Sequence, residues 1–182
     1  MIRGFAAIAL PEPVRFELSL LGHGLPVPRP VPAENLHLTL VFLGELPEPV
    51  VEDIDLAFRG VRAPGFTLRF GGLGMFGGAK PRLVHAEVAE SAALRHLQAK
   101  LETAARGAGM VEPPRRYTPH VTLARLPERG VERERLQRTV AGRPAPVAPS
   151  FAVDDFRLYR SRLGAGGAAY EELARYPLQA PA

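Results

Sequence analysis

A four-residue motif occurs twice in this chain, at residues 37–40 and 120–123: a His, one apolar residue, a Thr and a Leu. The residues around both copies are β-branched, aromatic or Leu, which favours strands over helices. Side chains two residues apart on a strand share one face, so the His and Thr of each motif should point the same way while the apolar residues enter a core. Burying two polar side chains together is costly, and we therefore expect this face to line a cleft. The predicted pairs are His37 with Thr39 and His120 with Thr122.

The remaining pattern alternates short apolar runs with amphipathic stretches that end in glycine. The runs predict strands at residues 1–10, 35–43, 65–70, 82–88, 118–125, 151–159 and 170–178. The stretches predict helices at residues 11–21, 47–59, 91–106 and 131–140. The second half repeats the order of the first, and the two motif histidines lie 83 residues apart (120 minus 37). This order indicates a duplicated α+β unit, with two copies packed around a pseudo-twofold axis.

Length and composition limit the possible classes of protein. The 182 residues, 46% of them apolar, fit a single domain over residues 1–182 with a substantial core. The sequence contains no Cys, which excludes disulfides, thiolate catalysis and Cys-based zinc sites. The apolar N-terminus is short and typical of a first strand, and no apolar run reaches membrane-spanning length, so we expect a soluble cytoplasmic protein. The net charge of +4 weakly favours a polyanionic partner, although an Arg-rich codon bias explains it equally well.

A glycine-rich stretch at residues 71–81 is predicted to be a loop between two strands. It matches G-x-G-x-x-G at Gly72, Gly74 and Gly77. A dinucleotide site needs a helix that begins at the third glycine, whereas Lys80, Pro81 and another predicted strand follow here. We therefore reject this match.

Two imidazoles and two hydroxyls around one volume suit chemistry on a phosphodiester. A neutral His accepts a proton and a protonated His donates one near neutral pH, so two facing His can act as base and acid in one reaction. In-line displacement at phosphorus needs that pair, together with hydrogen-bond donors for the oxygens where charge develops. Two Thr hydroxyls can supply the donors, and no metal is required. The residue types alone do not decide which His is the acid.

Several segments together resemble the 2H phosphoesterase superfamily, and within it the bacterial and archaeal RNA 2′,3′-cyclic phosphodiesterases once called 2′-5′ RNA ligases. The similarity covers nearly the whole chain. The matching segments are Pro32 to Gly44 around the first motif, Gly72-Leu73-Gly74-x-Phe76, Pro119-His120-Val121-Thr122-Leu123-Ala124-Arg125, and Leu158-Tyr159-Arg160-Ser161-Arg162-Leu163.

The resemblance implies a bilobal α+β fold with two mostly antiparallel sheets around a central cleft and helices on the outside. It also implies metal-independent hydrolysis of RNA 2′,3′-cyclic phosphate ends to 2′-phosphates, with reversible 2′-5′ ligation as a further capacity. His37 would donate a proton to O3′, His120 would activate water, and Thr39 and Thr122 would hold the phosphate oxygens. The expected partner is RNA with a cyclic phosphate end; we expect a monomer with no cofactor, no metal and no membrane.

The candidate substrate-binding residues are aromatic and cationic side chains. Relatives often carry aromatic residues after Arg29 and in the strand that holds His85, whereas this chain has Pro30 and no Trp. Stacking on a base would then fall to Phe42, Phe76 or Tyr117. His85 is interpreted as a strand-face His rather than a stacking substitute. Arg125 either contacts substrate or forms a structural ion pair, because its odd spacing from His120 places it on the other face of a regular strand.

Three alternative interpretations of the two motifs fit the same sequence. Both motif histidines could be structural residues on unrelated strands, although the Thr two residues after each makes this improbable. The cleft could belong to an RNA-end-binding protein with little turnover, although Arg would serve a pure phosphate clamp equally well. The same chemistry could also act on a small cyclic nucleotide or a cyclic ADP-ribose phosphate.

Overall fold

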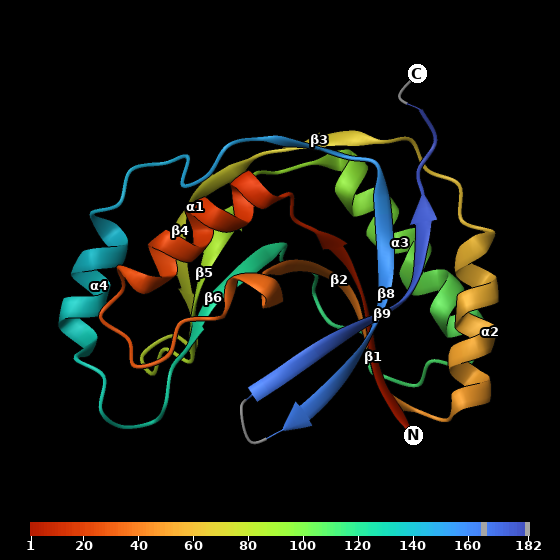
Figure 1. Cartoon of the computed structure of the whole chain (residues 1–182), viewed down its shortest axis with the longest axis horizontal. Helices are drawn as coiled ribbons and strands as arrows, with labels where there is room; N and C mark the ends of the chain where they lie inside the picture. The colour runs from red at the N-terminus through yellow and green to blue at the C-terminus, as the bar shows by residue number, and fades with distance from the viewer. Residues whose placement is uncertain (165–166, 181–182) are drawn as a thin grey trace.

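The computed structural model describes residues 1–164 and 167–180, in which helices and strands alternate along much of the chain (Figure 1). The strands are β1 (Ile2–Ala9), β2 (His37–Leu46), β3 (Phe66–Leu68), β4 (Phe70–Phe76), β5 (Leu83–Val88), β6 (His120–Arg125), β7 (Phe151–Val153), β8 (Asp155–Gly164) and β9 (Gly167–Pro177). The helices are α1 (Glu12–His23), α2 (Glu48–Arg59), α3 (Ala92–Gly107) and α4 (Arg133–Ala141), and a short 3₁₀ turn covers Ala33–Asn35. Each predicted helix is therefore present.

One unit of strand, helix, strand, helix and two strands occurs twice, first from β1 to β4 and again from β5 to β8. The large sheet has the order β4-β5-β6-β2-β1-β8-β9, and β3 pairs with β7 in a small second sheet. Every strand pairing is antiparallel. The predicted α+β fold with two antiparallel sheets is confirmed. The two copies also exchange strands, since β4 of the first pairs with β5 of the second and β8 pairs with β1.

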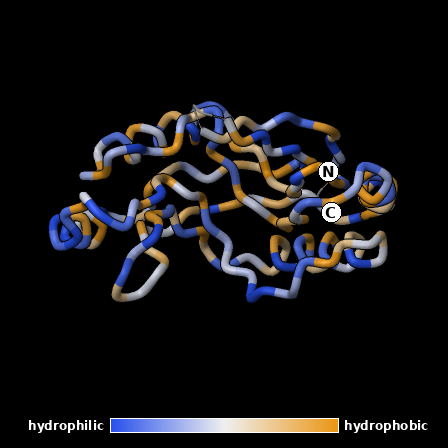
Figure 2. Tube along the Cα trace, turned by 90° about the horizontal axis from the view of Figure 1, so that it is seen from below, coloured by the Kyte–Doolittle hydropathy of each residue, from blue (hydrophilic) through white to orange (hydrophobic). Residues whose placement is uncertain are grey.

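Helices cover both halves of the large sheet. Helices α2 and α3 pack on β1 and β2, whereas α1 packs on β6 and α4 on β4 (Figure 1). The apolar stripe of α3 is fully buried through Leu94, Leu97 and Leu101, and the Leu94 amide donates to Oγ of Ser91, the predicted cap. Apolar residues concentrate in the strands that cross the middle of the molecule (Figure 2). Fully burying one such side chain contributes about 1.5–3 kcal/mol, so this stripe fixes α3 on the sheet.

The prediction of a loop over residues 71–81 is wrong for its first part, because β4 extends to Phe76. Glycine has low strand propensity, so the residue types here do not indicate strand pairing. In the structure Gly74 lies opposite His85, and a Cβ at Gly74 would sit 2.6 Å from Cε1 of His85. The glycine thus makes room for the imidazole. Gly77 has a φ of 115° and begins the turn into β5, not a helix, which agrees with rejecting the dinucleotide fingerprint.

Across residues 1–164 and 167–180, every helix is too short or too polar to cross a lipid bilayer.

Candidate active site

The two motif histidines each begin a strand, His37 at the start of β2 and His120 at the start of β6. Both are partly exposed, as are Thr39 and Thr122, whereas the apolar residues between and after them are buried. Leu38, Leu40, Val121 and Leu123 are each at most 2% exposed. The predicted alternation is therefore present in both strands, with a polar face and a core face.

Strands β2 and β6 are direct neighbours, and Leu38 pairs with Val121. In an antiparallel pair this register sets His37 opposite Thr122 and Thr39 opposite His120. Directly opposite side chains have Cβ atoms about 4.5–5.5 Å apart, and diagonal ones about 7–8 Å. The two imidazoles thus lie diagonally across a quartet of two His and two Thr.

Both imidazoles are held by the same backbone contact. Nδ1 of His37 lies 2.7 Å from the carbonyl oxygen of Asn35, and Nδ1 of His120 lies 2.8 Å from that of Thr118. A carbonyl only accepts, so Nδ1 carries the hydrogen in each ring and Nε2 remains free to accept or donate a proton. The Asn35 side chain also donates to the backbone of Ala168 on β9, which fixes the segment before β2.

The surroundings lower the pKa of both histidines. Burial lowers the pKa of His37 most, and the positive charges of Arg125 and His120 lower it further, against the hydrogen bond to Asn35. Burial also lowers the pKa of His120, assisted by Arg125 and opposed by the Thr118 hydrogen bond. Both rings are therefore biased toward the neutral form until an anion enters between them. The effect of His120 on the His37 pKa also agrees with their proximity.

Aromatic rings surround the two imidazoles differently. The His37 ring contacts Phe5 at 4.8 Å and Tyr170 at 5.1 Å between ring centroids. The His120 ring contacts Phe76 at 4.9 Å and His85 at 5.4 Å. The site is thus symmetric in its motif residues and asymmetric in the side chains around them.

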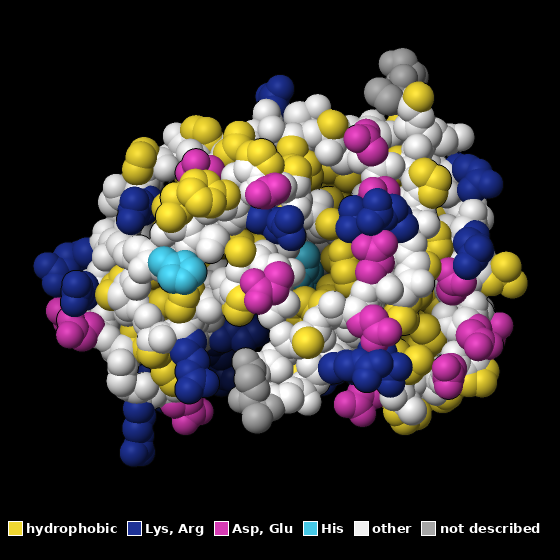
Figure 3. Space-filling model, viewed as in Figure 1, with side chains coloured by type: hydrophobic (Ala, Val, Ile, Leu, Met, Phe, Trp, Pro, Cys, Tyr) yellow, Lys and Arg dark blue, Asp and Glu magenta, His cyan; other side chains and the backbone are white. Residues whose placement is uncertain are grey.

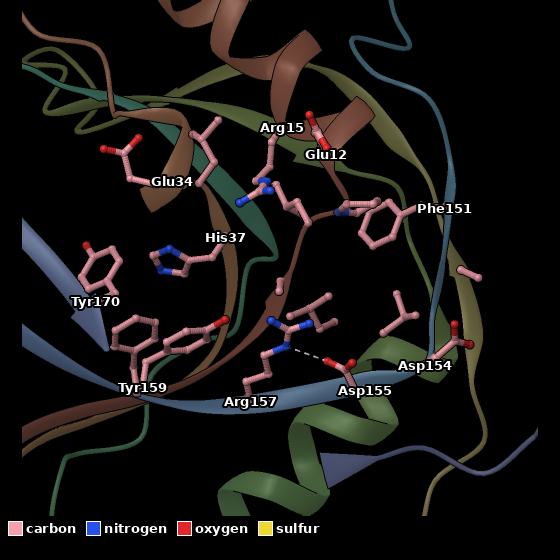
Figure 4. Close-up of a pocket in the computed structure, with 18 residues that line it drawn as sticks. Glu12, Arg15, Glu34, His37, Phe151, Asp154, Asp155, Arg157, Tyr159 and Tyr170 are labelled. Atoms are coloured by element: carbon pink, nitrogen blue, oxygen red, sulfur yellow. Dashed lines mark hydrogen bonds and ion pairs between the residues drawn. The ribbon is translucent and has the colours of Figure 1, made fainter. Parts of the chain in front are cut away.

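A cavity opens on each side of the quartet. The first, of about 360 Å³, includes His37, with Tyr159 and Tyr170 on one side and Arg15 from α1 on the other (Figure 4). The second, of about 400 Å³, has a lining that includes apolar side chains, three arginines and two glutamates together with Thr39 and His120. Its lining includes Phe42, Phe76, Met110, Tyr117, Arg106, Arg115 and Arg116.

The structure brings Phe42 and Tyr117, two of the predicted substrate-binding residues, into the second cavity. Phe42 is 37% exposed, and the Arg3 guanidinium lies 5.1 Å from its ring centroid. The Tyr117 hydroxyl donates to the Thr39 carbonyl at 3.3 Å, and burial raises the Tyr117 pKa well above its usual value. Arg125 lies at the exposed end of β6, and its charge acts on both histidines. Within the described residues it forms no ion pair, and its contact with substrate stays a prediction.

His85 is buried and packs against an aromatic ring, unlike an ordinary His on an open strand face. It is 5% exposed, its ring centroid lies 4.0 Å from that of Phe76, and its backbone pairs with Thr122. Its Nδ1 is buried without a hydrogen-bond partner among the described residues. Burial and the nearby His120 lower the His85 pKa to about 4, so it is neutral near pH 7. Gly74 opposite was the one sequence signal for this packing.

Replacing His85 with Phe should flatten the dependence of stability on pH. The folded-state pKa of about 4 lies below the usual value of 6.5, so the unfolded chain binds more protons between these values. The free energy of unfolding should therefore fall as pH drops through this window, by about 2–3 kcal/mol at pH 4.5 relative to pH 7. Urea denaturation at both pH values measures this loss. An equal loss in His85→Phe and the unmodified protein would contradict the assignment.

Within the part of the chain that the structure describes, no three His, Asp or Glu side chains are grouped to hold a metal ion.

Residues 18–165 of the chain match the 2′-5′ RNA ligase superfamily. The RNA 2′,3′-cyclic phosphodiesterase of Escherichia coli is 33% identical over 180 residues, covering 97% of this chain and 96% of the relative. The Thermus thermophilus protein of the same name is 34% identical over 195 residues, covering 98% and 91%.

Solved structures agree with the sequence matches. E. coli LigT complexed with 3′-AMP has a TM-score of 0.82 at 31% identity and covers 97% of this chain and 98% of its own. A crystal structure described as a phosphoesterase has a TM-score of 0.83 at 31% identity and covers 98% of each chain. The sequence match spans both His motifs and the fold agrees throughout, so this chain belongs to the 2′-5′ RNA ligase superfamily.

Proposed function

We propose that this protein hydrolyses 2′,3′-cyclic phosphate ends of RNA and leaves a 2′-phosphate. The observation that carries the proposal is the quartet of His37, Thr39, His120 and Thr122, which the register of β2 and β6 sets together and in which Nδ1 of each ring contacts a backbone carbonyl and leaves Nε2 free. Relatives that share the family over most of the chain are named RNA 2′,3′-cyclic phosphodiesterases. The 3′-AMP complex of LigT supports a nucleotide with a phosphate on its ribose as the kind of ligand.

The reaction is an in-line displacement at phosphorus. Nε2 of His120 takes a proton from water as the water oxygen bonds to phosphorus. The P–O3′ bond breaks on the opposite side, and protonated His37 gives its proton to O3′. The phosphate stays on O2′, and one water has been added. General acid and general base each contribute typically 10²–10⁴-fold to such reactions.

The two threonine hydroxyls supply donors to the non-bridging oxygens, where negative charge increases in the transition state. The register sets Thr122 opposite His37 and Thr39 opposite His120, so each hydroxyl lies beside the opposite imidazole. The Arg125 charge acts on both histidines and also favours an anion at this position. Base, acid and donors all come from side chains, so we propose that no metal or cofactor takes part.

In-line geometry also assigns the two cavities. The ribose carries both O2′ and O3′, so it lies on the side of the acid, His37. The first cavity, with Phe5, Tyr159 and Tyr170 near His37, then receives the terminal nucleoside. The second cavity lies on the side of His120, from which the attacking oxygen comes.

A second activity, reversible 2′-5′ ligation, is favoured by one observation. The cavity on the His120 side is large enough, at about 400 Å³, and apolar enough for a nucleoside, with Phe42, Phe76 and Tyr117 in its lining. A nucleoside bound there could present its 5′-hydroxyl in place of water, and His120 would take the hydroxyl proton. The cyclic phosphate would then open to a 2′-5′ phosphodiester.

Turnover of an oligonucleotide with a 2′,3′-cyclic phosphate end, in buffer containing EDTA, tests the proposed function. We expect a 2′-phosphate product and no effect of the chelator. A 3′-phosphate product would reverse the assignment of the leaving oxygen, and strong inhibition by EDTA would indicate a metal. Binding without turnover would favour the phosphate-clamp alternative. Activity on 2′,3′-cyclic mononucleotides alone would favour the small-nucleotide alternative.

A further inference from the structure

Three chain segments meet at the exposed end of β6 and bring cationic side chains together. On one side, Pro30 forms a bridge with Ala124, and the Val31 amide donates to the Leu123 carbonyl at 2.7 Å. On the other side, Leu83 pairs with Arg125. The ladder continues one residue further, where the Leu126 amide donates to the Arg82 carbonyl at 2.8 Å. Arg29 therefore lies beside Arg125 on one neighbouring segment, and Arg82 lies one residue before Leu83 on the other.

Two loops extend this cationic group. Residues 77–82 turn from β4 into β5, closed by hydrogen bonds from Arg82 to Phe76 and from Lys80 to Gly77. Residues 126–131 follow β6, and both loops lie below β5 and β6 at the lower left of Figure 1. Several Lys and Arg side chains project from the corresponding part of the surface in Figure 3. We name Arg29, Lys80, Arg82 and Arg129 the basic rim.

The basic rim carries positive charge that is typical of a surface that binds a polyanion. All four side chains are exposed, and among the described residues none has a carboxylate within ion-pair distance. Glu128 is the one carboxylate in the two loops. Many other arginines of the chain are neutralised by neighbours, for example Arg157 by Asp155 and Glu172, each at 2.9 Å. The rim is thus left available for phosphates.

The position of the rim matches the direction in which RNA must leave the site. Strands β2 and β6 are antiparallel, so the end of β6 lies beside the start of β2, where His37 stands. On the proposed function the terminal nucleoside is also on the His37 side. The lining of the first cavity includes four carboxylates, Glu12, Glu34, Asp154 and Asp155, against two arginines, Arg15 and Arg157, and this excess of negative charge disfavours a phosphate chain there. The rim offers the opposite charge.

We propose that the basic rim binds the sugar-phosphate backbone of single-stranded RNA immediately 5′ of the cyclic phosphate. This inference rests on the proposed function and adds that the enzyme acts on chain ends in preference to mononucleotides. These contacts with phosphates are electrostatic and do not distinguish one base sequence from another. Each phosphate that the rim neutralises adds about 0.7 to the slope of log affinity against log salt for a single strand.

The test compares two substrates, 2′,3′-cyclic AMP and an octanucleotide that ends in the same cyclic nucleotide. The variant is Arg82→Gln/Arg129→Gln. For the octanucleotide we expect kcat/KM at 0.15 M salt to fall about tenfold, and its salt slope to become shallower by about 1.4, the effect of two lost phosphate contacts. For 2′,3′-cyclic AMP we expect no change, because the mononucleotide does not reach the rim.

The matched control is Arg62→Gln/Lys100→Gln, which removes the same charge from exposed residues near α2 and α3. It should leave both substrates unaffected. Equal loss on the octanucleotide in the control and rim variants would overturn the proposal, as would a rim variant with an unchanged slope. If the unmodified protein hydrolysed neither substrate, the proposed function itself would have failed. If it hydrolysed 2′,3′-cyclic AMP and the octanucleotide with equal efficiency at every salt concentration, the rim alone would be refuted.

Discussion

Replacing His37 or His120 with alanine is expected to lower kcat on a 2′,3′-cyclic phosphate end by about 10²–10⁴-fold, the usual contribution of a positioned general acid or base. Nδ1 of each ring is occupied by a backbone carbonyl, which leaves Nε2 free for proton transfer. Neither Thr39 nor Thr122 can replace an imidazole in proton transfer near neutral pH. Steady-state hydrolysis of the cyclic oligonucleotide measures the loss.

The two variants should differ on a substrate whose leaving group needs no proton, such as a p-nitrophenyl phosphodiester. Loss of the acid, His37, should then lower kcat on this substrate only slightly, whereas loss of the base, His120, should still lower kcat strongly. His96→Ala is the matched control, because His96 is exposed on α3 and away from the quartet. Near-normal turnover of the cyclic oligonucleotide in both site variants would exclude paired acid and base catalysis. The reverse order of sensitivity would exchange the two roles.

Replacing Thr39 or Thr122 with valine is expected to lower kcat by about 10²–10³-fold, since this is the usual cost of removing one donor to a developing oxyanion. Valine keeps the shape and strand propensity of threonine, so the change removes little more than the hydroxyl. Both threonines lie on the open face of the sheet, and their neighbours Leu38 and Val121 hold the strands in register. The effect should therefore fall on kcat and leave the fold intact.

Thr67→Val on β3 provides the control, because Thr67 is an exposed strand threonine far from the quartet. Thermal melting should be nearly the same for all three variants. A threonine variant that raised KM and left kcat unchanged would indicate binding shared equally by the ground state and the transition state, and no stabilisation specific to the transition state.

Much of the fold could be predicted because the sequence patterns that specify its helices and strands lie within single elements. Helix α3 has Leu94, Leu97 and Leu101 at helical spacing after a capping Ser91, and these residues are buried as expected. The two motifs alternate polar and apolar residues, which fixes the face of each strand without knowledge of the partner. The repeated order of elements also indicated the duplication.

The features of the fold and the site that the sequence does not predict depend on contacts between distant segments. Strand β4 was missed because its glycines have no strand propensity of their own, and its pairing is explained by the His85 ring that occupies the space above Gly74. The burial of His85 depends on the same pairing with Gly74, so it also could not be predicted. The direct pairing of β2 with β6 likewise could not be derived from either strand, although it decides how the two imidazoles face one another.

The central claim is that His37 and His120 act on one phosphate. NMR titration of the histidine ring signals with 2′-AMP, a product analogue, tests it most directly. Both pKa values are lowered in the free protein, and a bound phosphate should raise both, because its negative charge stabilises each imidazolium. We predict that both signals shift with a single binding isotherm, while His96 does not respond. A shift of one ring without the other would contradict the account.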